Sequence, residues 1–158
     1  LRAADLGTNV DATPAEIDAD RKLLARIEVI RLQAGSRMGL GDVTDSVVPK
    51  VGLVGPANDA DFAVRYLTPH AVHKALAVTG AICLAAASKV PGTTVPPSAG
   101  EIVRIRHPGG VIEVPIEMNG AEDVAWAGML RTARRIMEGT LLVPGRIWAG
   151  HALKLAAE

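Results

Sequence analysis

The sequence has 158 residues and a mass of 16.4 kDa, and 49% of its residues are hydrophobic, which suits one domain with a substantial core better than two domains. Seventeen Lys and Arg residues balance seventeen Asp and Glu residues, so no net basic field attracts nucleic acid or anionic lipid, and we expect no nucleic acid as a partner. The single cysteine, Cys83, allows no internal disulfide and no cysteine-rich zinc site, which favours a cytoplasmic protein.

The chain begins without an initiator methionine, a cationic start or an apolar signal segment. We therefore expect a fragment or a processed half of a longer protein. Further along, Thr13 and Glu16 match a capping box, and Pro14 occupies the first helical position. This pattern predicts a helix over residues 13–35.

Apolar side chains recur at helical spacing along this segment and predict one stripe that packs on a core. The charged side chains between them, Arg31 included, are expected to face water. Gly35 is the expected end of the helix, and a loop rich in glycine follows at residues 38–42.

Two short runs of β-branched or aromatic residues, 47–54 and 62–67, predict strands joined by a loop. Proline lacks the backbone donor of a ladder, so the first strand is expected to begin after Pro49 or to lie at a sheet edge.

Residues 72–89 are apolar almost all round, which predicts a central helix packed on nearly every side. The apolar run at 75–87 is shorter than the roughly 20 residues that span a bilayer, so we expect no membrane anchor. Cys83 lies within this run without a neighbouring base, and a buried core cysteine is favoured over a nucleophile.

Thr79 and Gly80 interrupt this apolar run, and a glycine inside a helix costs roughly 1 kcal/mol relative to alanine. One interpretation is that the helix begins near Thr79 and that Gly80 lets a ligand approach the backbone. Close packing of helix against sheet is the interpretation that the residues alone favour.

Residues 101–106 and 111–117 flank a His-Pro-Gly-Gly turn and predict a β-hairpin. The last stretch, residues 124–143, fits helical spacing in one part and strand composition in another, and periodicity alone does not decide between them.

His70, His73 and Lys74 stand where the predicted central helix begins. A helix start offers unpaired N–H groups and partial positive charge, so two imidazoles and an ammonium there could hold a carboxylate. The alternative, given even odds, is that the histidines only cap the loop and that Lys74 extends to water.

Arg131, Arg134 and Arg135 supply three guanidinium groups suited to carboxylates, although a solvated charged face is the commoner explanation of such a run. Asp42 and Asp45 have no histidine beside them in the sequence, and the histidines lack metal-binding spacing. We therefore predict neither a catalytic triad nor a metal site.

Several motifs taken in order make the sequence resemble the cofactor-independent isomerase family of 4-oxalomesaconate tautomerase and 2-methylaconitate isomerase. The resemblance runs over nearly the whole chain, and the joint order is more specific than any one motif. The motifs are Glu28-Val29-Ile30-Arg31, Met38-Gly39-Leu40-Gly41, Pro49-Lys50, His73-Lys74-Ala75 with Val78-Thr79-Gly80-Ala81-Ile82-Cys83, and Arg131-Thr132-Ala133-Arg134-Arg135.

The resemblance implies an α/β (α+β) fold similar to diaminopimelate epimerase, in which each of two domains is a curled mixed sheet around a central helix. Only the second half is matched. Residues 1–12 would be the crossover from a missing N-terminal domain, and residues 13–158 the C-terminal epimerase-like domain. The resemblance also favours strands over 124–132 and near 140–143.

The activity implied by the resemblance is an allylic proton shift, or keto-enol tautomerisation, on an unsaturated di- or tricarboxylate, without a cofactor. The catalytic lysine and thiol of the family are associated with the first domain, so no residue here is assigned as the catalytic base. This half is expected to bind substrate through His73, Lys74, Thr79, Gly80, Arg131 and Thr132, with Met38 and Gly39 lining the same cleft.

Other hypotheses stay open from the sequence. The chain could be a non-catalytic binding module or an inactive fragment, and a less favoured alternative is an amino-acid racemase or epimerase that depends on Cys83. The expected partners are a small polycarboxylate and the missing N-terminal domain. An uncovered apolar surface is expected to drive self-association, so we predict a homo-oligomer.

Overall fold

The computed structural model describes residues 1–130 and 132–147. Within them lie a short 3-10 helix, three α-helices and five strands. In chain order these are η1 (Ala4–Leu6), α1 (Pro14–Ala19), α2 (Arg21–Arg37), β1 (Val51–Gly55), β2 (Phe62–Leu67), α3 (Val78–Lys89), β3 (Ile102–His107), β4 (Gly110–Asn119) and β5 (Asp123–Ala127). In this part of the chain no helix combines the length and the apolar character needed to cross a membrane.

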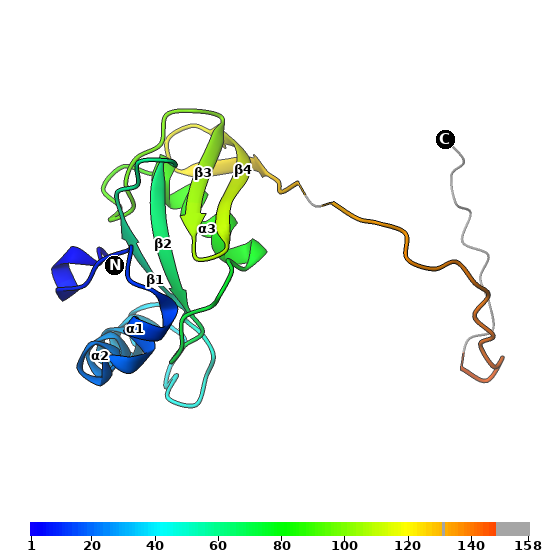
Figure 1. Cartoon of the computed structure of the whole chain (residues 1–158), viewed down its shortest axis with the longest axis horizontal. Helices are drawn as coiled ribbons and strands as arrows, with labels where there is room; N and C mark the ends of the chain where they lie inside the picture. Colours follow the sequence, from blue (N-terminus) through cyan, green and yellow to red (C-terminus); the bar gives the residue numbers. More distant parts are fainter. Residues whose placement is uncertain (131, 148–158) are drawn as a thin grey trace.

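The strands form one mixed sheet in the order β1-β2-β3-β4-β5. β2 and β3 run parallel and are connected through α3, whereas the other neighbours are antiparallel. Figure 1 shows α1 and α2 beside β1 and β2, with α3 on the far side of the strands. The predicted α+β class, with a curled mixed sheet about a central helix, is confirmed.

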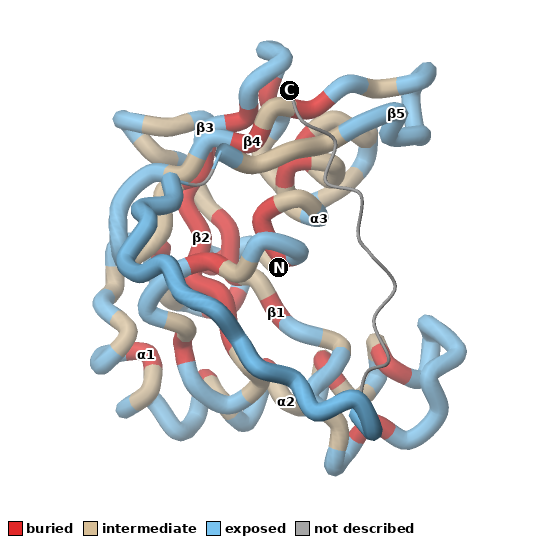
Figure 2. Tube along the Cα trace, turned by 90° about the vertical axis from the view of Figure 1, so that its right-hand side faces the viewer, coloured by how far each residue is buried: buried red, intermediate tan, exposed pale blue. Residues whose placement is uncertain are grey.

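β2 is the centre of the molecule because both of its faces are covered. Phe62, Val64 and Tyr66 pack in a core with α3, β3 and β4. Ala63 and Leu67, which point the opposite way along the strand, pack in a second core with α1 and α2. All of β2 is therefore buried, as its position between the helices in Figure 2 shows.

The predicted N-terminal helix is two helices that meet at Asp20. The capping box is confirmed, since the Thr13 hydroxyl accepts from the Glu16 N–H while the Glu16 carboxylate accepts from the Thr13 N–H. Asp20 ends α1 and its carboxylate accepts from the Lys22 and Leu23 N–H groups, which caps α2.

The prediction that the helix stops at Gly35 is wrong, because α2 continues to Arg37. Gly35 serves another purpose. A Cβ atom at this position would collide with the side chain of Val43, so the glycine allows the following loop to pack closely on the helix.

The central helix is shorter and less enclosed than predicted. Val72 pairs with Leu67 at the end of β2, and the helix begins only at Val78. One stripe of α3 is buried, formed by Gly80, Ala81, Ala85 and Ser88. Cys83 is exposed, which contradicts the prediction of a core cysteine, because it lies off the stripe that faces the sheet.

The predicted strands of the sheet are confirmed with small changes at their ends. β1 begins at Val51, after Pro49, and β2 covers the predicted residues. β3 and β4 form the predicted hairpin. β5 accounts for the first part of the predicted strand at 124–132 and ends at Ala127.

The strand predicted near residues 140–143 is wrong. These residues belong to an extended segment that leaves the body of the molecule, as Figure 1 shows. Leu141 and Leu142 are 85% and 88% exposed, so within residues 1–130 and 132–147 no neighbouring edge supplies the hydrogen bonds and packing that make a strand. The apolar patch and the self-association expected from the sequence stay predictions.

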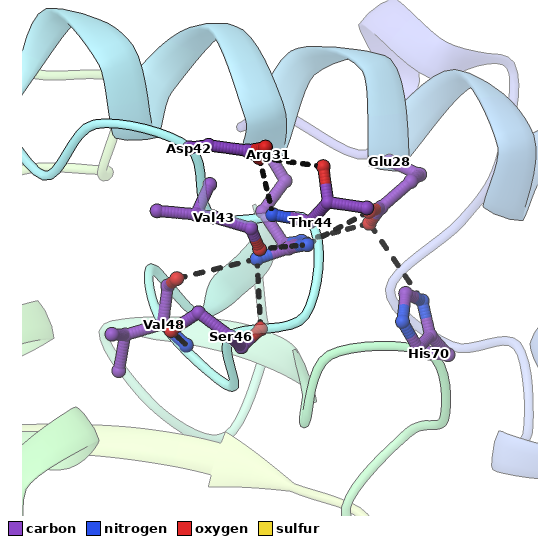
Figure 3. Close-up of polar contacts among 8 residues, drawn as sticks. All are labelled: Glu28, Arg31, Asp42, Val43, Thr44, Ser46, Val48 and His70. Carbon is purple, nitrogen blue, oxygen red and sulfur yellow. Dashed lines mark hydrogen bonds and ion pairs between the residues drawn. The ribbon is translucent and has the colours of Figure 1, made fainter.

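Arg31 is completely buried, which corrects the expectation that it faces water. Its Nε and Nη2 atoms donate to the Glu28 carboxylate at 2.7 and 2.8 Å, a bidentate ion pair (Figure 3). The same guanidinium donates to the carbonyl oxygens of Val43, Ser46 and Val48 at 2.9, 3.1 and 3.3 Å. One side chain thus holds the loop between α2 and β1 on the helix through three hydrogen bonds to loop carbonyls.

Amphipathic spacing could not reveal this role, because the partners of Arg31 are backbone carbonyls of a loop that only the tertiary fold brings near. The Arg31 guanidinium hydrogen-bonds the Glu28 carboxylate and holds the pKa of that carboxyl below its ordinary value, against a smaller opposing effect of burial. His70 Nδ1 lies 3.7 Å from the same carboxylate.

Replacing Arg31 should destabilise the protein strongly. Arg31→Met leaves the Glu28 carboxylate and three loop carbonyls without their donor, so we expect the free energy of unfolding to fall by about 3 kcal/mol. Urea denaturation followed by circular dichroism measures the change. Arg37→Met, at an exposed position of the same helix, should stay within about 0.5 kcal/mol of the parent. Equal stability of both variants would contradict the role assigned to Arg31.

The Glu28 carboxyl should contribute to acid denaturation. Because its pKa is lower in the folded state, its contribution is complete above the ordinary carboxyl pKa of about 4.3 and is lost as the pH falls through the lower folded value. Glu28→Gln should therefore flatten the fall in unfolding free energy below that pH. Glu117→Gln removes an exposed carboxylate as a control, and an equally flattened profile there would refute the assignment.

Candidate functional site

The amino end of α3 is reached through a short return of the chain after β2. The Thr68 N–H donates to the Ala71 carbonyl, and the His73 N–H donates to the Tyr66 carbonyl at 2.7 Å. The Asp18 carboxylate of α1 accepts from the Val72 N–H at 2.8 Å and fixes the return to the rest of the fold. The segment that precedes α3 is therefore positioned by both β2 and α1.

The start of α3 carries no side-chain cap. Ala77 occupies the N-cap position in an extended conformation, and alanine has no oxygen to accept from the first-turn N–H groups. These donors and the positive end of the helix dipole together favour an anion.

His73 and Lys74 were predicted at the helix start itself, and in the structure they precede the N-cap residue Ala77 by four and three positions. His73 is half-buried, and its Nδ1 accepts from the Ala75 N–H at 3.0 Å. Lys74 is exposed. His70, in contrast, lies beside Glu28, with its Nδ1 atom 3.7 Å from the carboxylate.

Thr79 is exposed in the first turn of α3, whereas Gly80 is buried against the ring of Tyr66. A Cβ atom at Gly80 would lie 2.7 Å from Tyr66 Cζ and 2.9 Å from its hydroxyl oxygen. Close packing of helix on sheet is therefore confirmed, and the helix begins at Val78, next to Thr79. The approach of a ligand to the Gly80 backbone stays a prediction.

Tyr66 is a component of this region that sequence reasoning missed. It is the only tyrosine of the sequence, and its ring packs against Gly80 in the first turn of α3. Burial raises the pKa of its hydroxyl, and the neighbouring Cys83 adds to this effect. The chain's one tyrosine, near the end of a predicted strand, was the available signal.

Two further predicted site residues, Met38 and Gly39, belong to another part of the fold. Met38 and Gly39 are exposed at the end of α2. Thr132 is exposed on the segment that leaves the body, and Arg131 lies outside the described residues.

Two hollows lie away from this site. One of about 660 Å³ lies between the N-terminal segment and residues 93–97, and another of about 750 Å³ lies between the end of α3 and Trp126. Across residues 1–130 and 132–147, no three His, Cys, Asp or Glu side chains are grouped so that they could hold a metal ion.

Residues 1–144 match the PrpF protein family. The chain belongs to this family. The YbhH protein of Escherichia coli (strain K12) is 43% identical over 150 residues, which cover 91% of this chain and 43% of that protein. The (4E)-oxalomesaconate Delta-isomerase of Novosphingobium sp. (strain KA1) is 39% identical over 150 residues, which cover 90% of this chain and 42% of the enzyme.

The PrpF fold is also found in a crystal structure of methylitaconate-delta-isomerase, with a TM-score of 0.78 and 30% identity over 88% of this chain and 42% of that one. The family predicted from the sequence is confirmed. A 4-oxalomesaconate tautomerase of Pseudomonas putida and a 2-methyl-aconitate isomerase of Shewanella oneidensis are each 34% identical to this chain. The chain spans about two fifths of the length of the PrpF relatives it matches.

Adding one methyl group at Gly80 should disturb the packing of α3 on Tyr66. Gly80→Ala would gain helix propensity, yet the clash with the Tyr66 ring should outweigh it and lower the unfolding free energy by about 2 kcal/mol. Thermal unfolding measures the loss, and Thr79→Ala at the exposed neighbouring position is the control. A second change, Tyr66→Leu, should recover part of the loss in the Gly80→Ala background, and no recovery would count against this contact.

Proposed function

We propose that this chain provides the substrate-binding half of a cofactor-independent isomerase, which moves a proton across an allyl system in an unsaturated di- or tricarboxylate. The observation that carries the proposal is the uncapped amino end of α3, with His73 and Lys74 in the segment that leads into it. The names of the PrpF relatives support the substrate class, since they are isomerases of oxalomesaconate, methylaconitate and methylitaconate.

In this reaction negative charge develops on the substrate, and the protein must stabilise it. A base removes a proton from the carbon next to a carboxylate, the double bond shifts, and an acid returns a proton at the far end of the allyl system, so the product is an isomer of the substrate. The dienolate that forms between these steps is stabilised by donors and cations that are already aligned. The first-turn N–H groups of α3 and the Lys74 ammonium are such groups.

The proton-moving base is proposed to come from polypeptide outside these 158 residues, since the helix start offers donors and a cation but no paired acid and base. Arg131 and Thr132 are proposed to add contacts when the polypeptide is assembled as in the longer relatives. A cytoplasmic location and a homo-oligomeric state stay predictions.

Binding of trans-aconitate tests the proposal. Lys74→Met should weaken its affinity about tenfold at low salt, because an ammonium beside the carboxylate is lost, and rising ionic strength should shrink the difference. Arg131→Ala should weaken it several-fold. Isothermal titration calorimetry of the polypeptide carrying these residues measures both, with Lys22→Met, an exposed lysine of α2, as the control. Affinity unchanged in both site variants would reject the site.

A further inference from the structure

We propose that the Tyr66 hydroxyl is a further binding group of this site and donates a hydrogen bond to the substrate carboxylate that the first turn of α3 holds. The inference rests on the proposed function and deepens it, because it adds a neutral donor from the sheet to the backbone donors of the helix and the Lys74 ammonium. The position of the hydroxyl, its lack of a hydrogen-bond partner and its accessibility support the proposal.

The free donors of α3 end at Gly80. The first hydrogen bond within the helix runs from the Ala81 N–H to the Ala77 carbonyl at 2.8 Å. The N–H groups of Val78, Thr79 and Gly80 precede that bond, and no side chain caps them. An anion that accepts from these groups therefore lies next to the Gly80 backbone.

The Tyr66 hydroxyl lies beside the last of these donors. A Cβ atom at Gly80 would be 2.9 Å from the hydroxyl oxygen of Tyr66. The Cβ position and the amide nitrogen are both attached to the Gly80 Cα atom, so the hydroxyl oxygen and this N–H group are close neighbours. A carboxylate has two oxygens and about four sites that accept hydrogen bonds, so one carboxylate can accept from both donors.

The Tyr66 side chain is buried, yet its hydroxyl makes no hydrogen bond within the described part of the chain. The residue is 8% exposed, and its hydrogen bonds are made by its backbone, which includes the carbonyl that accepts from the His73 N–H. Its hydroxyl oxygen is not among the completely enclosed atoms that lack a partner, so it keeps some accessible surface. Most buried hydroxyls in native proteins have a partner, and a bound carboxylate would supply one here.

The ring also has the protonation state that a donor needs. Burial raises the pKa of the Tyr66 hydroxyl, and the nearby Cys83 raises it further. The hydroxyl therefore keeps its proton at neutral pH. A hydrogen bond from a hydroxyl to a charged carboxylate is shorter and stronger than one between neutral groups, so a carboxylate is the acceptor that this position favours.

A binding role and a purely structural role predict different effects of Tyr66→Phe. This substitution removes the hydroxyl and keeps the ring that packs on Gly80. Because the hydroxyl makes no hydrogen bond in the free protein, the thermal unfolding temperature of the free variant should equal that of the parent or exceed it. Its affinity for trans-aconitate should be about tenfold weaker, because a hydrogen bond to a charged group is lost.

Isothermal titration calorimetry with trans-aconitate, on the same polypeptide as the Lys74→Met comparison, measures the affinities. Cys83→Ser is the matched control, because it changes an exposed neighbour of the Tyr66 hydroxyl and keeps the hydroxyl itself, and it should bind as the parent does. Tyr66→Phe with the affinity of the parent, or an equal loss in Cys83→Ser, would overturn the inference. A lower unfolding temperature of free Tyr66→Phe would overturn it as well, since the hydroxyl would then have a structural partner.

A second measurement needs no substitution of Tyr66. Because Tyr66 is the only tyrosine of the sequence, this chain labelled with carbon-13 at tyrosine Cζ gives one NMR signal, from the carbon that bears the hydroxyl. This signal should move as trans-aconitate is added and should stop moving at saturation, and a signal that stays in place throughout would overturn the inference. If Lys74→Met still weakens binding, the proposed function survives that result. If the parent does not bind trans-aconitate, the proposed function fails and the inference fails with it.

Discussion

The contact between Gly80 and the ring of Tyr66 determines how closely the first turn of α3, with its N–H groups, packs on the sheet. Because no side chain separates the first turn of the helix from the tyrosine, the backbone of α3 packs directly on the end of β2. The uncapped N–H groups of the helix are then held at the end of the sheet where β3 also finishes. A larger residue at either position of contact would move the donors relative to His73 and Lys74.

The opposite face of β2 is organised by a different interaction, the buried Arg31. Its guanidinium binds Glu28 and three loop carbonyls, so it fixes the connection between α2 and β1 without contributing to the apolar core. The motifs around Glu28 and Arg31, around Met38 and Gly39 and around Pro49 all lie on α2 or in the loop that follows it. The hydrogen bonds of Arg31 to the carbonyls of Val43, Ser46 and Val48 hold that loop on the helix.

Much of the architecture followed from local physical chemistry. The capping box at Thr13 and Glu16, the start of β1 after Pro49 and the turn between β3 and β4 depend on hydrogen bonds and backbone preferences within a few residues, so they could be predicted. The helix start was placed six residues too early because apolar composition does not distinguish an extended return that pairs with β2 from a first helical turn. Cys83 was expected in the core for the same reason, since composition does not show which stripe of an apolar helix meets the sheet.

By itself the sequence determined the family, the mixed sheet with its helices and the segment that precedes the central helix, because each depends on residue types at fixed spacing. Only the tertiary structure decided which of those residues meet. It brought Gly109 to Lys74 across more than thirty positions of the chain, turned His70 toward Glu28, and buried Arg31 among loop carbonyls. These contacts depend on strand register and on the close approach of backbones, which are properties of the folded chain that no local pattern encodes.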